Sequence, residues 1–323
     1  MSLRPQAFIF PCSKRPIAYQ SPLALLKRVI LKNYSHRDLH RVSWPSRFAK
    51  LSARIRSTRT AEEFADEAAR LLAPARDVHL WLQVNGRRVP TFTRDVQRNV
   101  SFKNLPRLVP RWIEHNSLVA TGSFSSGIQY LCIRGWPAHA ANQLRPAYAV
   151  LRKAVAGARP LIIDVRANGG GSEPLAALFA GCFIRHPVCY AKHLTRRAGK
   201  FLGPIERWLK PNRRRPHYSG PVAVLIGTGT VSSCESFVLM MRQVPGCKLI
   251  GQPTAGASGN PLPFDLGNGV VVYVPSWQDL DLDGVCIEGR GVAPDILVHA
   301  LPSAFTDPVL ASALRFLRAN KHG

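Results

Sequence analysis

Ser232 stands at a point in the sequence where a nucleophile for acyl transfer could be held. The apolar run 222–226 predicts a buried strand, two glycines break it, and the letters SSCE at 232–235 open an apolar segment of helical length. A serine at such a strand–turn–helix junction lies beside the free backbone N–H groups that begin a helix. The same Ser-x-x-Glu spacing is also that of a capping box, in which Ser232 and Glu235 would only cap the helix. This stretch alone leaves both interpretations open.

A base for that serine could come from the pair Asp77 and His79. Residues 77–84 alternate like a half-buried strand, on which residues two apart face the same side. A carboxylate beside an imidazole fixes its tautomer and raises its basicity. A single Asp-x-His is a weak signal, however, because a surface pair is its ordinary explanation.

Backbone donors for an oxyanion could come from a triple glycine. The run 161–166 predicts a buried strand, the letters NGGG at 168–171 close it, and a helix is expected to follow from Ser172. Glycines between a strand and a helix let the backbone approach a ligand and expose its N–H groups. The loop has neither the Gly-Lys-Ser/Thr ending of a phosphate loop nor the Gly-x-Gly-x-x-Gly fingerprint. An oxyanion hole is therefore the better use of these donors.

The elements that must position these residues follow from the apolar periods. Besides the helices that follow Ser172 and Ser232, helices are expected over 22–34, from Thr60 to just before Pro74, over 141–156 and over 308–318. From about residue 125 onward, strands alternate with helices, which indicates α/β layering.

Three regions are expected along the chain. They are a basic flexible arm over 1–21, a helical N-terminal subdomain over 22–124 that ends in a strand carrying His79, and a catalytic core over 125–323.

The composition limits which classes of protein this chain can belong to. With 323 residues and 46% hydrophobic content the chain can bury a real core, and no run of 18 apolar residues predicts a membrane span. The apolar patch 7–10 is shorter than a secretory core segment. Seven cysteines without paired spacing argue against a complete disulfide framework. These features favour reduced thiols and a cytoplasmic location over export.

The formal charge of +25 also needs an interpretation. Residues 1–60 carry 13 Lys or Arg against one acid, Asp38, and a second basic cluster lies at 196–215. Such patches could bind nucleic acid, anionic lipid or acidic substrates. No nucleic-acid motif accompanies them, so a solvated basic surface is the favoured interpretation and a nucleic-acid partner is not expected.

Three segments, in their order and spacing, carry a family resemblance: LIIDVRANGGG (161–171), TVSSCESF (230–237) with GQPTAGASG (251–259), and IEGRGVAPDI (287–296). They resemble the C-terminal-processing (tail-specific) serine protease family, which includes the tricorn core protease and the interphotoreceptor retinoid-binding protein. The resemblance is strong over about 125–300. It extends more weakly to NYSH…VSW (33–44) and RDVHLWL (76–82).

This resemblance implies an α/β (α+β) fold, with a crotonase-like spiral β-sheet core, flanking helices and a small helical N-terminal subdomain. It implies Ser232 as the nucleophile. It also implies an oxyanion hole made by the backbone N–H of Ser233 and of the glycine loop, at Gly170 or Gly171.

The chain departs from the family pattern at the base. Tail-specific proteases use a lysine in the loop after the nucleophile, and the matching residue here is Ala257. The tricorn-like branch lacks that lysine and uses a histidine assisted by a glutamate, which match His79 and Glu288. Asp77 is the alternative orienter of His79. Residues 83–125 are too few for the peptide-binding PDZ module of many members.

The resulting hypothesis is a serine-type peptidase that forms an acyl-enzyme on Ser232, with His79 as its base and a peptide or protein as its substrate. The alternative is a catalytically inactive protein on the same fold that carries peptides or apolar ligands. Neither hypothesis calls for a cofactor or a metal ion. The sequence carries no sign of an oligomeric state.

Overall fold

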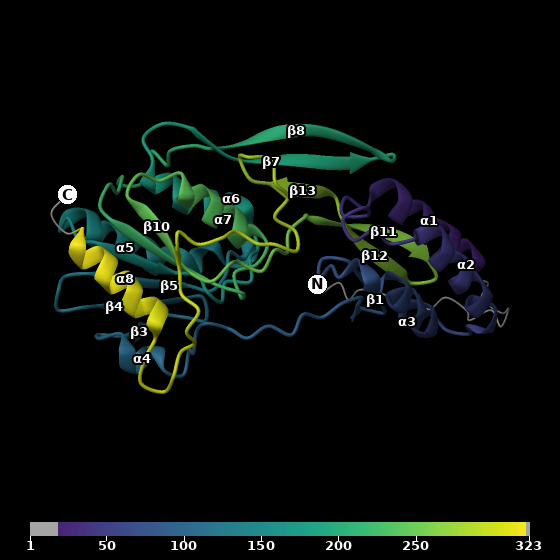
Figure 1. The fold of residues 1–323 in the computed structure, drawn as a ribbon, viewed down its shortest axis with the longest axis horizontal. Coiled ribbons are helices and arrows are strands. Elements are labelled where there is room, and N and C mark those ends of the chain that lie inside the picture. Colours follow the sequence, from purple (N-terminus) through teal and green to yellow (C-terminus); the bar gives the residue numbers. More distant parts are fainter. Residues whose placement is uncertain (1–18, 321–323) are drawn as a thin grey trace, which may run out of the picture.

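The structure is a computed structural model that describes residues 19–320, in which a core lobe and a smaller N-terminal lobe are bridged by a long hairpin (Figure 1). Most of the arm expected over 1–21 lies outside the described residues, and the first helix begins at Gln20. Among residues 19–320 no helix is both long enough and apolar enough to cross a bilayer.

The core lobe is built on a seven-stranded sheet in the order β14-β10-β9-β6-β5-β4-β3. Strands β14 to β5 run parallel to their neighbours, and β4 and β3 are added antiparallel. The strands are β3 Ile113–Glu114, β4 Val119–Ser123, β5 Gln129–Ile133, β6 Leu161–Asp164, β9 Val222–Ile226, β10 Cys247–Gly251 and β14 Ile296–Leu297. The expected α/β layering is confirmed.

Helices cover both faces of this sheet, which explains why β5, β6 and β9 are continuous apolar runs. Successive residues of a strand point to opposite faces. Leu161 and Ile163 accordingly pack in one cluster with three helices, whereas Ile162 packs in a second cluster with two others. The helices are α5 Arg145–Ala156, α6 Glu173–Ala180 and α7 Ser233–Arg242 on the first face, and α4 Leu105–Leu108 and α8 Pro308–Ala319 on the second.

The N-terminal lobe packs three helices on a four-stranded sheet in the order β11-β12-β1-β2. Its elements are α1 Gln20–Asn33, α2 Trp44–Arg54, α3 Ala61–Leu72, β1 Trp81–Val84, β2 Arg87–Pro90, β11 Pro261–Gly267 and β12 Val270–Pro275. Thr60 caps α3 by accepting a hydrogen bond from the Glu63 N–H group (3.1 Å), as its sequence predicts.

A third sheet, in the order β13-β7-β8, links the lobes along the top of Figure 1. Its strands are β7 Val188–Arg197, β8 Lys200–Leu209 and β13 Trp277–Leu280. The tip of the β7–β8 hairpin reaches the N-terminal lobe. There the Gly199 N–H group donates to the Lys32 carbonyl (2.8 Å), and Arg196 pairs with Asp38 (2.7 Å). Short 3₁₀ turns complete the fold at Ile55–Ser57, Ala73–Ala75, Ala138–Leu144 and Gly181–Phe183.

Two details of the sequence interpretation need correction. The strand expected over 77–84 begins only at Trp81, because residues 77–80 form a turn that the Asp77 side chain closes on the His79 N–H group (2.8 Å). The sheets also cross the expected boundary near residue 124. Strands β3 and β4 belong to the core sheet, and β11 and β12 complete the N-terminal sheet.

Candidate active site

Ser232 lies between β9 and α7 with a strained backbone. Its φ is 60° and its ψ is −131°, a combination that a non-glycine residue adopts only when its surroundings enforce it. The Ser232 N–H group donates to the Ala257 carbonyl (2.9 Å) and lies 3.3 Å from Glu235 Oε2. The loop around Ala257 therefore fixes the serine at the entrance to the helix.

Glu235 explains how that loop is held. Its side chain is fully buried and accepts hydrogen bonds from Thr254 Oγ1 (2.6 Å), the Gly256 N–H group (2.7 Å) and the Ala257 N–H group (2.8 Å). Burial raises the pKa of Glu235 to about 7 against these hydrogen bonds. Glu235 thus caps the Ser232 end of α7 and also ties it to the loop. Helix capping and a nucleophile site are compatible here.

The glycine loop runs alongside the nucleophile. A Cβ atom at Gly170 would lie 2.8 Å from the Ser232 Cβ atom, so only glycine fits beside the serine. The Gly170 N–H group donates to the Asn168 side chain (2.9 Å). The N–H groups of Gly171 and Ser233, in contrast, donate to no group in the part of the chain that the structure describes. Of the two glycines that the sequence left open, Gly171 therefore offers the free donor.

A buried ion-pair network holds the strand that leads into this loop. Arg166 is 0% exposed and bonds both Asp164 at the end of β6 (2.6 Å) and Asp307 at the start of α8 (2.8 Å). Tyr130 on β5 also donates to Asp164 (2.7 Å). These contacts fix the strand end, so the glycine loop begins from a rigid point.

His79 lies in the turn before β1, half-buried, rather than on the strand that the sequence predicts. Asp77 and His79 are therefore not same-face residues of a strand, and Asp77 contacts the His79 backbone rather than its ring. Among residues 19–320 the His79 ring makes no hydrogen bond to Ser232, and its Nδ1 atom is buried without a partner. The expected contact of Glu288 with His79 is likewise not formed among these residues.

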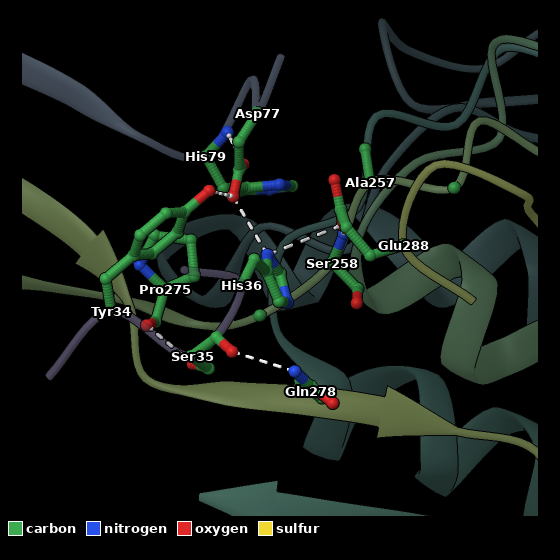
Figure 2. Close-up of polar contacts among 12 residues, drawn as sticks. Tyr34, Ser35, His36, Asp77, His79, Ala257, Ser258, Pro275, Gln278 and Glu288 are labelled. Atoms are coloured by element: carbon green, nitrogen blue, oxygen red, sulfur yellow. Dashed lines mark hydrogen bonds and ion pairs between the residues drawn. The ribbon is translucent and has the colours of Figure 1, made fainter. Parts of the chain in front are cut away.

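A second histidine, His36, lies beside the carboxyl groups of Asp77 and Glu288 instead (Figure 2). Its Nδ1 atom lies 2.8 Å from Asp77 Oδ2 and 4.0 Å from Glu288 Oε2, and all three side chains are buried. The Tyr34 hydroxyl donates to the same Asp77 oxygen (2.9 Å), and Glu288 accepts from the Ser258 N–H group (2.9 Å). Sequence reasoning missed His36. The only signal available was the NYSH segment, in which a single histidine follows a helix.

The two histidines differ in their electrostatics. Burial works against a charged His36, but the hydrogen bond with Asp77 and the charges of Glu288, Asp77 and Asp279 raise its pKa to about 9. Burial lowers the pKa of His79, and the charge of His36 lowers it further against the opposing charge of Asp77. The raised pKa favours a protonated His36 at neutral pH even though its Nε2 atom is buried without a partner among residues 19–320, and the lowered pKa favours a neutral His79.

The carboxylates differ as well. Burial disfavours the charge of Asp77, yet contacts with His36 and His79 outweigh burial and lower its pKa. Burial and the nearby Asp77 charge raise the pKa of Glu288 to about 8. The cluster therefore approaches neutrality, with Asp77 charged, His36 protonated and Glu288 holding its proton near neutral pH.

The same three groups were tested as a metal site. Their nearest ligand atoms all lie within 4.8 Å of one another, a spacing that an ion could bridge. The 2.8 Å between His36 Nδ1 and Asp77 Oδ2 is, however, a hydrogen-bond distance. Two ligands about 2.0–2.1 Å from a tetrahedral zinc ion would stand roughly 3.3 Å apart. We therefore interpret the cluster as three groups that share protons.

A pocket of about 430 Å³ opens in front of Ser232. Its far wall carries charge: Asp279 pairs with the buried His193, and Arg207 lies 3.4 Å from Glu173. Polar and small residues dominate the wall, which is formed by Gly171, Ser172, Glu173, Pro174, Arg207, Ser232, Ser233, Ser236, Ser258, Gly259, Asn260, Pro261, Trp277 and Asp279. The strained serine and the two residues with free N–H groups, Gly171 and Ser233, therefore line one cavity.

Comparisons with known proteins identify a matching family. The family model described as Peptidase family S41 matches residues 127–298, which is more than half of the 323 residues. The chain is 28% identical over 193 residues to carboxyl-terminal-processing peptidase 2, chloroplastic, from Arabidopsis thaliana, covering 58% of this chain. It covers 34% of that relative, so it spans about a third of the length of the curated relative that it matches.

Solved structures share the fold over nearly the whole chain. A crystal structure from Parabacteroides merdae ATCC 43184 has a TM-score of 0.79 at 22% identity, covering 93% of this chain and 97% of that one. The tricorn protease has a TM-score of 0.60 at 14% identity, covering 96% of this chain and 38% of that one. The fold class and the family resemblance read from the sequence are both confirmed.

Proposed function

Because the chain belongs to peptidase family S41, we propose that it is a serine-type peptidase that cleaves peptide bonds through an acyl-enzyme on Ser232. One observation carries the proposal. A serine with a strained backbone shares a pocket with Gly171 and Ser233, whose N–H groups have no acceptor within the described chain. Strain of this kind persists where a site needs it, and free N–H groups beside a serine are what acyl transfer requires.

In the proposed acylation the Ser232 Oγ atom attacks the substrate carbonyl carbon, and the carbonyl oxygen becomes an oxyanion. The N–H groups of Ser233 and Gly171 would donate hydrogen bonds to this oxyanion and stabilise its charge. The carbon–nitrogen bond then breaks, and the amine leaves with the proton taken from Oγ. Water then gives a proton to the base and attacks the acyl carbon, the carbon–Oγ bond breaks, the base returns the proton to Oγ, and the carboxylic acid product leaves.

His79 is the better of the two histidines for the base. A general base needs a free lone pair at the working pH. The lowered pKa of His79 keeps its imidazole neutral, whereas the pKa of about 9 keeps His36 protonated. His79 is also half-buried, whereas His36 is 2% exposed, so His79 has the better access to a substrate. Oγ–H would thus transfer its proton to His79, and His79 would return it to the leaving amine.

Asp77 is the better of the two candidate orienters. It holds the His79 backbone N–H group at 2.8 Å, whereas Glu288 holds the Ser258 N–H group at 2.9 Å on the opposite side of the cluster. The lysine position of tail-specific proteases carries Ala257, which is 1% exposed and supplies no amine. A histidine mechanism is therefore proposed in place of a serine–lysine dyad.

A second candidate function is a carrier on the same fold. It is favoured by one observation: no hydrogen bond joins Ser232 to His79 among residues 19–320. Catalytic hydrogen bonds are often long without substrate and tighten when it binds, so the observation does not displace the peptidase.

Labelling with a fluorophosphonate, followed by peptide mass spectrometry, separates the two functions. The peptidase predicts one adduct, on Ser232, that disappears in Ser232→Ala. Ser57→Ala removes an exposed serine of the N-terminal lobe and is the matched control, which should label like the unmodified protein. A folded protein that takes up no label would establish the carrier instead.

A further inference from the structure

His36 neither gives nor takes the proton in the proposed reaction, yet it lies among the buried ionisable side chains of the site (Figure 2). Asp77 Oδ2 lies 2.8 Å from its Nδ1 atom and Glu288 Oε2 lies 4.0 Å from it. The ring also abuts the pocket wall, since a Cβ atom at Gly259 would lie 2.9 Å from its Cε1 atom. A surface histidine would have none of these contacts.

The hydrogen bonds determine which atom carries the proton. Asp77 is ionised and therefore only accepts: one oxygen takes the His79 N–H group, and the other takes the Tyr34 hydroxyl and His36 Nδ1. Nδ1 must therefore be the donor. Glu288 already accepts from the Ser258 N–H group, and its Oε2 atom lies 4.0 Å from His36 Nδ1.

We propose that His36 is a positioning residue of the active site, a buried imidazolium that balances the charge of Asp77 and leaves His79 as the neutral base. This inference rests on the proposed function in that it takes His79 to be the base. His36 follows α1 and Asp77 precedes β1, both in the N-terminal lobe, whereas Ser258 lies between β10 of the core sheet and β11, and Glu288 lies between β13 and the core strand β14. The imidazolium therefore also joins the two lobes at the pocket.

A chain of contacts connects His36 to the nucleophile. His36 Nδ1 lies 4.0 Å from Glu288 Oε2, Glu288 accepts from the Ser258 N–H group, and the neighbouring Ala257 carbonyl accepts from the Ser232 N–H group (2.9 Å). Removing the charge of His36 should therefore affect both the base and the loop that orients the serine.

The charged groups that face the two histidine rings determine how the pKa of His79 should respond to a change at His36. Asp77, Glu288 and Asp279 face His36. His79 faces Asp77 and Asp279, which favour its protonation, and His36 and Arg88, which oppose it. Without the charge of His36, only Arg88 would oppose two carboxylates. Burial would still lower the pKa of His79, but that pKa would rise without the opposing charge of His36, so a smaller fraction of His79 would be neutral in mildly acidic solution.

The test replaces His36 by asparagine, whose side-chain N–H can donate to Asp77 but carries no charge. His40→Asn, four residues away on the exposed surface, is the matched control. Two readouts are taken on the full chain: the NMR titration of the His79 ring, and the pH profile of fluorophosphonate labelling. We expect the His79 midpoint to rise by about one unit in His36→Asn, which makes labelling at pH 6.5 slower by about two- to fivefold, with recovery by pH 9. His40→Asn should change neither.

Three results would overturn the inference. An unchanged His79 midpoint in folded His36→Asn would reduce His36 to a structural residue. Loss of labelling at every pH in His36→Asn, with labelling retained in His79→Asn, would make His36 the base itself. Labelling abolished by a chelator and restored by Zn²⁺ would show that the cluster holds a metal ion. If the unmodified protein takes no label, the proposed function fails, and the NMR titration still decides whether His36 controls the protonation of His79.

Discussion

The two lobes build their halves of the site in different ways. In the core lobe, the nucleophile and the oxyanion donors are set by backbone geometry: a strained serine, a tightly packed glycine and a fully buried carboxylate that bonds loop N–H groups. In the N-terminal lobe, the histidines are set by side-chain charges, in turns rather than in strands or helices. The reactivity of Ser232 should therefore be sensitive to changes of shape in the core lobe. The protonation of the histidines in the N-terminal lobe should make that reactivity depend on pH.

The largest effect is expected from a change of shape in the core lobe. In Gly170→Ala the new methyl group would lie 2.8 Å from the Ser232 Cβ atom and 2.7 Å from the Val231 carbonyl oxygen, at a φ of 89° that disfavours alanine. We expect labelling of Ser232 to fall by about 10²–10³-fold, comparable to the loss of an oxyanion donor. Gly169→Ala is the matched control, because a Cβ atom there meets nothing within 4 Å. Equal labelling rates in the two variants would show that the close fit at Gly170 does not matter.

A smaller, charge-dependent effect is expected in the N-terminal half. Asp77 is ionised and accepts from Tyr34, His36 and the His79 backbone, so Asp77→Asn should cost about 1–3 kcal/mol of unfolding free energy and slow labelling about tenfold. Glu288→Gln should change labelling at pH 7 less than about twofold, because the raised pKa of Glu288 already keeps it protonated. Urea unfolding and labelling rates measure both. A larger loss in Glu288→Gln than in Asp77→Asn would reverse the roles of the two acids.

The smallest effect expected is a pH dependence of stability. The folded pKa of His36 is raised to about 9 from 6.5, and that of Glu288 to about 8 from 4.5. The folded state therefore binds these protons more tightly than the unfolded state, and the resulting stability is lost as pH rises through the folded values. Tm should fall by a few degrees between pH 6.5 and 9, and the fall should be shallower in Glu288→Gln. A Tm that rises over this range would contradict the charge states assigned to the cluster.

The same contrast explains how much the sequence could predict. The core-lobe site follows local signals: an apolar strand, a glycine loop and a helix start lie within a few residues of one another, and Ser232, Ser233 and Gly171 share one pocket. Apolar alternation could not reveal the turn at Asp77, because it is closed by a side-chain hydrogen bond rather than by an apolar pattern. The contact of His36 with Asp77 joins residues 41 apart, and a lone histidine after a helix carries no signal for it. The roles assigned to His79 and Glu288 stay predictions.

The central claim is that Ser232 is a nucleophile activated by a neutral histidine, and the pH profile of its fluorophosphonate labelling tests that claim most directly. Because guanidinium groups stay protonated and Ala257 has no amine, labelling should rise with pH through a single midpoint at or below the ordinary histidine range. It should fall sharply at every pH in His79→Ala. A profile that is unchanged in His79→Ala, or that rises only above pH 9, would remove His79 as the base and contradict this account.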